Sequence, residues 1–215
     1  MPLEISQIQP KIFFAKFDDQ YKMCVATLRI EAAKTEINKS HDNHKKYIKE
    51  YVKNTKVSGC FISSKNLRSF LKLFKGGKMA DQEKDFVKAV LKTAKESGLS
   101  SRNKFSIIVC FNGPNSITFK HEMSHSMFYA DYKYRMKVLR LFKKIKPDIK
   151  QKMMEYLNKN DYRFKSFESI DFVDEINARI STENVLQRAF DDTIHIPKRE
   201  LDKFKKLYEG NTKIH

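Results

Sequence analysis

The feature that most constrains the fold is a continuous apolar run, Phe105–Phe111 (FSIIVCF), which ends abruptly at Asn112-Gly113-Pro114-Asn115. A run of this kind favours a strand, and the cluster of Asn, Gly and Pro breaks regular structure. Asn115 or Ser116 can then cap a helix through its side-chain oxygen. The sequence therefore predicts a strand, a tight turn and a helix in direct succession.

Apolar patterns elsewhere separate a front part that contains strands from a back part that is mainly helical. We expect strands at Ile12–Phe17, Met23–Ile30 (a helix being the alternative) and Val57–Ile62, a polar helix or loop at 41–53, and helices capped by Ser64 and Asp81 that end at Gly76-Gly77 and Gly98. In the back part, we expect helices at 132–146, 148–158, 168–180 and 182–190, a loop at Asp161–Phe167 and a last helix opened by Pro197. The prediction is an α+β fold in one domain, 1–215, with a sheet-containing part, 1–114, and a helical part, 115–215.

The helix expected after the turn contains the segment His121-Glu122-Met123-Ser124-His125, an HExxH pattern. Residues four apart lie on one face of a helix, so His121 and His125 can offer two imidazole nitrogens to one Zn²⁺. Glu122 lies beside His121, where its carboxylate can reach a metal-bound water without binding the metal. Zinc lowers the pKa of that water to about 7, so the pattern predicts hydrolysis with Glu122 as the general base.

A catalytic zinc site needs a third protein ligand, and two carboxylates are candidates. Asp131 follows His121 at the offset that metzincin proteases use, but those proteins turn the chain with a Gly where Phe128 stands here. A helix that continues past His125 would carry Asp131 roughly 9 Å further along its axis, too far for a zinc bond of ~2 Å, and would leave it to cap the next helix. Glu175 lies at the edge of an apolar helix face, where a buried carboxylate needs a partner such as a metal. We therefore expect Glu175 to be the third ligand.

The stretch KHEMSHSMFYADYKYR resembles small, mostly uncharacterised bacterial zincin-like proteins, and the resemblance covers about 105–180. In those proteins an aromatic pair and a Tyr-Arg follow the HExxH helix, and a later helix carries an Asp-Glu pair before a small residue. The matching positions here are His121, Glu122, His125, Tyr129, Tyr134, Arg135, Asp174, Glu175 and Ala178. Arg179 stands where an aromatic residue is expected, and Asn177 where a longer amide is usual. The resemblance implies a gluzincin-type metallopeptidase with His121, His125 and Glu175 as ligands. Some translocated bacterial effectors are also small HExxH proteases without a secretory signal, so an effector-like origin stays open.

Three tyrosines, Tyr129, Tyr132 and Tyr134, follow the motif closely. One phenol could stabilise the oxyanion of the reaction by hydrogen bonding, and all three could equally be packing residues. Of the three, we assign the catalytic role to Tyr134. His41-x-x-His44 and His195 are weaker candidates for metal binding and for lining the cleft.

The formal net charge of +17 and the pI near 9.7 imply attraction to acidic partners. Residues 133–165 are the densest basic region, with 12 Lys or Arg against 3 Asp or Glu. A solvated lysine coat explains the same numbers, so nucleic acid or an acidic protein stays open as a partner. The alternative to a peptidase is therefore a basic binding module with a structural zinc or none.

Two further features bear on the compartment and the substrate. Cys24, Cys60 and Cys110 are odd in number and far apart, which indicates reduced thiols. We expect no membrane span and no secretory signal, hence a cytoplasmic protein or one delivered by a secretion route without a cleaved signal peptide. For a protein or peptide substrate, Phe105–Phe111 is the strand expected to pair with an extended segment.

Overall fold

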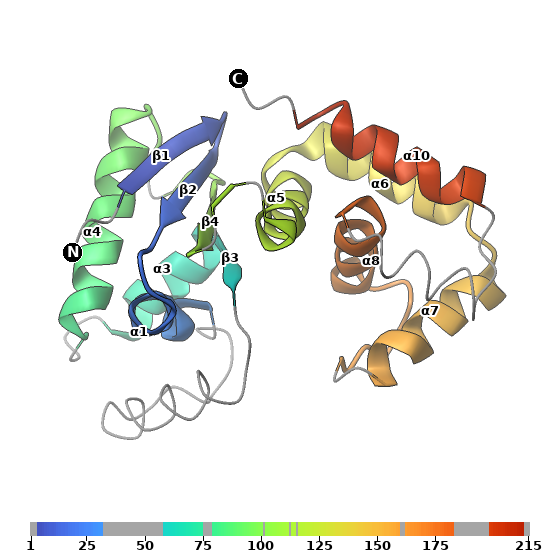
Figure 1. The fold of residues 1–215 in the computed structure, drawn as a ribbon, viewed down its shortest axis with the longest axis horizontal. Coiled ribbons are helices and arrows are strands. Elements are labelled where there is room, and N and C mark those ends of the chain that lie inside the picture. The colour runs from blue at the N-terminus through green and yellow to red at the C-terminus, as the bar shows by residue number, and fades with distance from the viewer. Residues whose placement is uncertain are drawn as a thin grey trace. The chain divides into compact units, whose positions relative to one another are not determined.

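The computed structural model describes residues 4–31, 58–74, 79–100, 102–111, 113–114, 116–159, 162–182 and 198–212. The fold is α+β, as predicted, with one small sheet and a majority of helix. The chain divides into two compact units, Met1–Glu122 and Met123–His215, and the boundary falls within a single helix, α5 (Ile117–Ala130) (Figure 1).

The first unit is built on a four-stranded mixed sheet in the order β1-β2-β4-β3. Its strands are β1 (Glu4–Gln9), β2 (Ile12–Lys16), β3 (Gly59–Ser63) and β4 (Ser106–Cys110). β4 pairs with β2 in parallel and with β3 antiparallel, and every residue of β4 is buried. This double pairing explains the continuous apolar run, and it corrects the expectation that Phe105–Phe111 receives a substrate strand, because both of its edges are already used.

The described residues of the first unit also form the helices α1 (Gln20–Glu31), α3 (Ser64–Leu73) and α4 (Asp81–Glu96), besides the start of α5. α1 contacts α3, α4 and β3, and side chains of all three helices join those of the sheet in one apolar core. The predicted strand at Met23–Ile30 is wrong, and the helical alternative is correct. Met23, Cys24, Ala26 and Ile30 are all buried there, so neither a period of two nor a period of 3.6 stands out in the sequence.

The second unit is helical. It contains the end of α5, α6 (Tyr132–Lys143), α7 (Pro147–Lys159), α8 (Ile170–Thr182) and α10 (Lys198–Glu209). α10 packs against α6 and α8, and α6 also contacts α8. Pro147, expected to stop the preceding helix, is itself the first residue of α7, a position that its fixed φ suits. The expected segments 41–53 and 182–190 lie outside the described residues, apart from Thr182, the last residue of α8.

None of the helices in the described part of the chain combines the length and the apolar character that a membrane span requires.

Candidate metal centre

The helix that carries the HExxH segment begins where the sequence predicted. Ser116 Oγ accepts a hydrogen bond from the backbone N–H of Phe119 at 3.1 Å, which caps the first turn of α5. The start of α5 also packs closely on the sheet: the hydroxyls of Thr118 and Ser58 are hydrogen-bonded, and the Phe119 ring meets Phe14 edge-on at 5.2 Å. The first turn of α5 is therefore held against the sheet just before the two histidines.

Close packing at Gly59 adds to this attachment. A Cβ atom at Gly59 would lie 2.6 Å from Cys110 Sγ, 2.7 Å from the backbone oxygen of Val109 and 2.8 Å from Thr118 Cγ2. Contacts this short are repulsive, so only a residue without a side chain allows β3 to approach β4 and α5 this closely.

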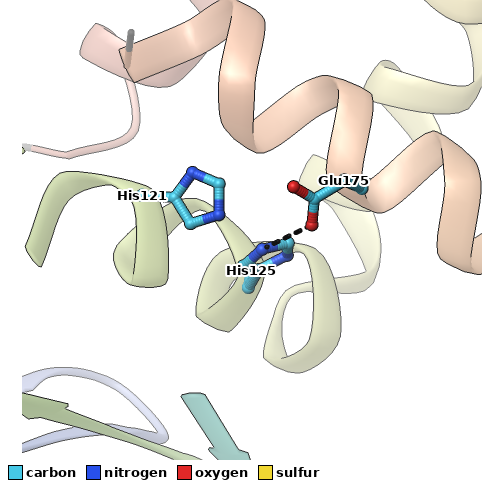
Figure 2. A group of neighbouring side chains, drawn as sticks. All are labelled: His121, His125 and Glu175. Carbon is cyan, nitrogen blue, oxygen red and sulfur yellow. Dashed lines mark ion pairs between the residues drawn. The ribbon is translucent and has the colours of Figure 1, made fainter. Parts of the chain in front are cut away.

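α5 runs without a break to Ala130, so His121 and His125 lie one turn apart on the same face. Glu175 comes from α8 and faces the two imidazoles in Figure 2. One ligand atom from each of the three residues can be chosen so that all lie within 4.8 Å of one another. His125 and Glu175 are mostly shielded from solvent, with 13% and 11% of their side chains exposed.

The spacing of these atoms can be compared with the geometry of a tetrahedral zinc ion. Two ligands bound at about 2.05 Å with a tetrahedral angle lie about 3.3 Å apart. His125 Nε2 and Glu175 Oε2 are 3.5 Å apart, marked by the dashed line in Figure 2. Two imidazoles and one carboxylate are also a donor set that zinc uses in catalytic sites. The residues present therefore fit a zinc ion.

Asp131, the other candidate ligand, has a different role. It is the N-cap residue of α6, and its Oδ1 accepts hydrogen bonds from the backbone N–H groups of Lys133 at 2.7 Å and Tyr134 at 3.1 Å. The prediction that the helix continues past His125 and leaves Asp131 to cap the next one is confirmed.

The remaining nitrogen of His125 also has a carboxylate beside it. Nδ1 lies 3.0 Å from Asp174 Oδ2, a distance at which the Nδ1–H group donates a hydrogen bond. Such a contact fixes the tautomer, leaves Nε2 with its lone pair for a metal and holds the ring in one orientation. Asp174 and Glu175 thus act on the two different nitrogens of one histidine.

Glu175 is held by two residues that were not predicted as part of the site, Tyr162 and Arg179. Its Oε1 accepts hydrogen bonds from Tyr162 at 2.8 Å and from Arg179 Nε at 2.5 Å, and Arg179 Nη2 also donates to the Tyr162 hydroxyl at 2.5 Å. Burial, followed by the Glu175 charge, raises the pKa of Tyr162 to about 12, so the phenol keeps its proton and remains a donor. With Oε1 satisfied in this way, Oε2 is the oxygen directed at His125.

A buried amide ties together the two helices that carry the candidate ligands. Asn177, fully buried on α8, donates through Nδ2 to Ser124 Oγ at 2.8 Å, and its Oδ1 accepts from the Tyr134 hydroxyl at 3.3 Å. Burial raises the pKa of Tyr134, a buried residue whose phenol belongs to this network. The catalytic role assigned to Tyr134 from the sequence stays a prediction, and the contacts give it a clear part in aligning α5, α6 and α8.

The other residues predicted from the sequence lie as follows. Glu122 is half-buried. The pKa of the Cys110 thiol is raised to about 12, first by the burial of Cys110 and then by the negative charge of Glu122. Tyr129 is half-buried at the end of α5, and Tyr132 is exposed at the start of α6. His41, His44 and His195 lie outside the described residues. Two residues of the site, Arg179 and Tyr162, were not predicted from the sequence. Arg179 follows Glu175 by one helical turn, and this spacing could have indicated the ion pair between them. No feature of the sequence indicates the contact between Tyr162 and Glu175.

Comparison of the chain with family models, curated proteins and solved structures gave no match.

Proposed function

We propose that the chain is a zinc-dependent peptidase of the gluzincin type, with His121, His125 and Glu175 as ligands and Glu122 as the general base. One observation carries the proposal: three donors of the types that catalytic zinc sites use converge from two helices within 4.8 Å, with a glutamate directly after the first histidine. A purely structural site would have no use for a base at that position.

The residues around the site have distinct tasks in this proposal. A bound zinc ion would polarise the substrate carbonyl and lower the pKa of a water molecule to about 7. Glu122 takes a proton from the attacking water and delivers it to the leaving amine. Asp174 orients His125, while Tyr162 and Arg179 orient Glu175, so that the ligand atoms are preorganised.

The sheet supports a peptide as substrate. β4 is paired on both sides, but among the described residues no strand pairs with the outer edge of β3 (Gly59–Ser63). An extended peptide that added to this edge would form backbone hydrogen bonds without regard to its side chains. β3 also lies next to the start of α5, through the hydroxyl contact between Ser58 and Thr118.

The test is cleavage of a proteome-derived peptide library by the zinc-loaded protein, with Glu122→Gln as the matched variant. Because Glu122 is not a ligand, the variant should retain zinc and fold yet lose at least a hundredfold in cleavage rate, since general base catalysis contributes about 10²–10⁴-fold. Equal cleavage by both proteins would refute the assignment of the base. Loss of zinc from the variant would mean that Glu122 is a ligand.

A further inference from the structure

Helix α6 carries a line of positive charge that the proposed peptidase activity does not use. Its twelve residues, Tyr132–Lys143, include five Lys or Arg and no Asp or Glu. Lys133, Lys137 and Arg140 on the helix and Lys144 at its C-cap are all exposed. They recur at steps of four, three and four residues, so they follow one face over roughly 16 Å of helix axis. We call these four residues the α6 stripe.

A second helix shows that this arrangement is not the general lysine coat of the chain. α4 carries four exposed lysines at steps of four, four and three residues, namely Lys84, Lys88, Lys92 and Lys95. α4 also contains four acidic residues, and two of them pair with these lysines: Asp81 with Lys84 at 3.0 Å and Glu96 with Lys92 at 3.9 Å. By contrast, no carboxylate in the described part of the chain forms an ion pair with the α6 stripe.

The uncompensated charge has a cost within the helix. Like charges one turn apart repel each other, and α6 contains no acid to reduce the repulsion. An anionic partner that lies along the stripe would relieve it. The spacing of four charges along a single line suits an extended chain of charges better than a single anion.

An exposed aromatic ring stands beside this line of charge. Tyr132, directly before Lys133, is 65% exposed, and the Arg135 guanidinium lies 5.6 Å from the centre of its ring. A positively charged track with an accessible aromatic face is the combination that binds single-stranded nucleic acid, because phosphates follow the charges and a base stacks on the ring. We propose that α6 is a binding surface for single-stranded nucleic acid, with the α6 stripe on the phosphates and Tyr132 stacked on a base.

The apolar residues of α6 argue against a lipid or a protein in this place. An amphipathic helix that lies on a membrane inserts its apolar face, but Tyr134, Val138 and Phe142 are buried in the second unit. Protein interfaces have an apolar centre, and Tyr132 is the one large exposed hydrophobic residue of α6. A duplex is disfavoured because its bases are already stacked and unavailable to the ring.

The test is fluorescence anisotropy with labelled oligo(dT) and oligo(U) over a range of salt concentration. Four phosphate contacts on a single strand predict that log K falls with log[salt] with a slope of about −3. The combined variant Lys133→Gln, Lys137→Gln, Arg140→Gln and Lys144→Gln should lose nearly all of this slope and at least tenfold in affinity at low salt. The control variant removes the same charge from α4 (Lys84→Gln, Lys88→Gln, Lys92→Gln and Lys95→Gln). It should retain the salt slope and the affinity at low salt.

A further variant separates stacking from charge. Tyr132→Leu should lower the affinity about fivefold or more and leave the salt slope unchanged, because stacking involves no counterion release. Comparison of the two oligonucleotides shows whether DNA or RNA is preferred. Circular dichroism establishes that each variant is folded, and none of the substituted residues is a candidate metal ligand, so the result does not depend on the peptidase proposal.

Three results would overturn the inference. The first is an equal loss of binding in the α6 and α4 variants, which would indicate attraction to net charge alone. The second is binding to duplex that exceeds binding to single strands and is unaffected by Tyr132→Leu. The third is stripe-dependent binding to phosphatidylserine vesicles without binding to either oligonucleotide, which would assign α6 to a lipid surface instead.

Discussion

Replacement of Glu175 and of Asp131 by Ala should separate metal binding from helix capping. Glu175 Oε2 lies 3.5 Å from His125 Nε2, whereas Asp131 is engaged with two backbone N–H groups at the start of α6. Zinc affinity should therefore depend on Glu175, whereas Asp131→Ala should lower stability and leave zinc affinity nearly unchanged. The two variants are matched, because each removes one acidic side chain from the second unit.

The magnitudes follow from the contacts. Loss of a group that only orients a zinc ligand costs about 10–100-fold in affinity, so loss of the ligand Glu175 should cost more than about 100-fold. Asp131→Ala removes an N-cap, which costs about 1 kcal/mol and lowers Tm by about 2–4 °C for a chain of this length. Glu175→Ala also removes the ion pair with Arg179, which is mostly buried, and leaves the donor groups of Arg179 and Tyr162 without this acceptor, so this variant should lose stability as well.

Both quantities can be measured on the same preparations. Zinc affinity is obtained by competition with a chelating dye, and thermal unfolding is followed with EDTA present so that bound metal does not contribute. A reversed ranking, in which Asp131→Ala lowers zinc affinity strongly and Glu175→Ala leaves it unchanged, would contradict both assignments.

Three further predictions concern the surroundings of the site. Asp174→Ala should lower zinc affinity about 10–100-fold, whereas Asp171→Ala, on the same helix but exposed, should leave it unchanged. Equal effects of the two substitutions would contradict the proposal that Asp174 orients His125. Asn177→Leu should lower the free energy of unfolding by about 1–3 kcal/mol in chemical denaturation, because its buried partners lose their hydrogen bonds, and a change near zero would contradict this. The Cys110 thiol, with a pKa of about 12, stays protonated below that pH, so iodoacetamide should not label it in the native protein at pH 8, and rapid labelling would contradict its burial.

The parts of the fold that were predicted correctly are those with strong local signals. β4 and α5 followed from an apolar run, a cluster of turn residues and a capping Ser116. The absence of Gly after His125 was enough to predict that α5 continues and that Asp131 caps α6. In each case the backbone conformation is decided by residues that are neighbours in the sequence, so it can be predicted without knowledge of the tertiary structure.

The parts that were missed depend on tertiary packing. The segment of α1 is predicted as a strand because nearly all of its central residues are apolar. These residues are apolar on every side because α1 is buried against the sheet and two other helices. β1 is mostly polar and is a strand because it pairs with β2. Tyr162 reaches Glu175 from a segment between helices, and its distance from the ligand is fixed by packing alone. The position of Glu175 beside the histidines was inferred from the need of a buried carboxylate for a partner, which is a physical argument and not a local signal.

In the proposed site, two histidines and one carboxylate hold a zinc ion with one position open. This coordination can be measured by X-ray absorption at the zinc edge, on protein loaded with one equivalent of zinc. We expect one bound zinc per chain with nitrogen and oxygen ligands at about 2.0–2.2 Å, two of them imidazoles, and one site exchangeable by a small anion. Sulfur at about 2.3 Å, four protein ligands, or a protein that takes up no zinc would contradict it.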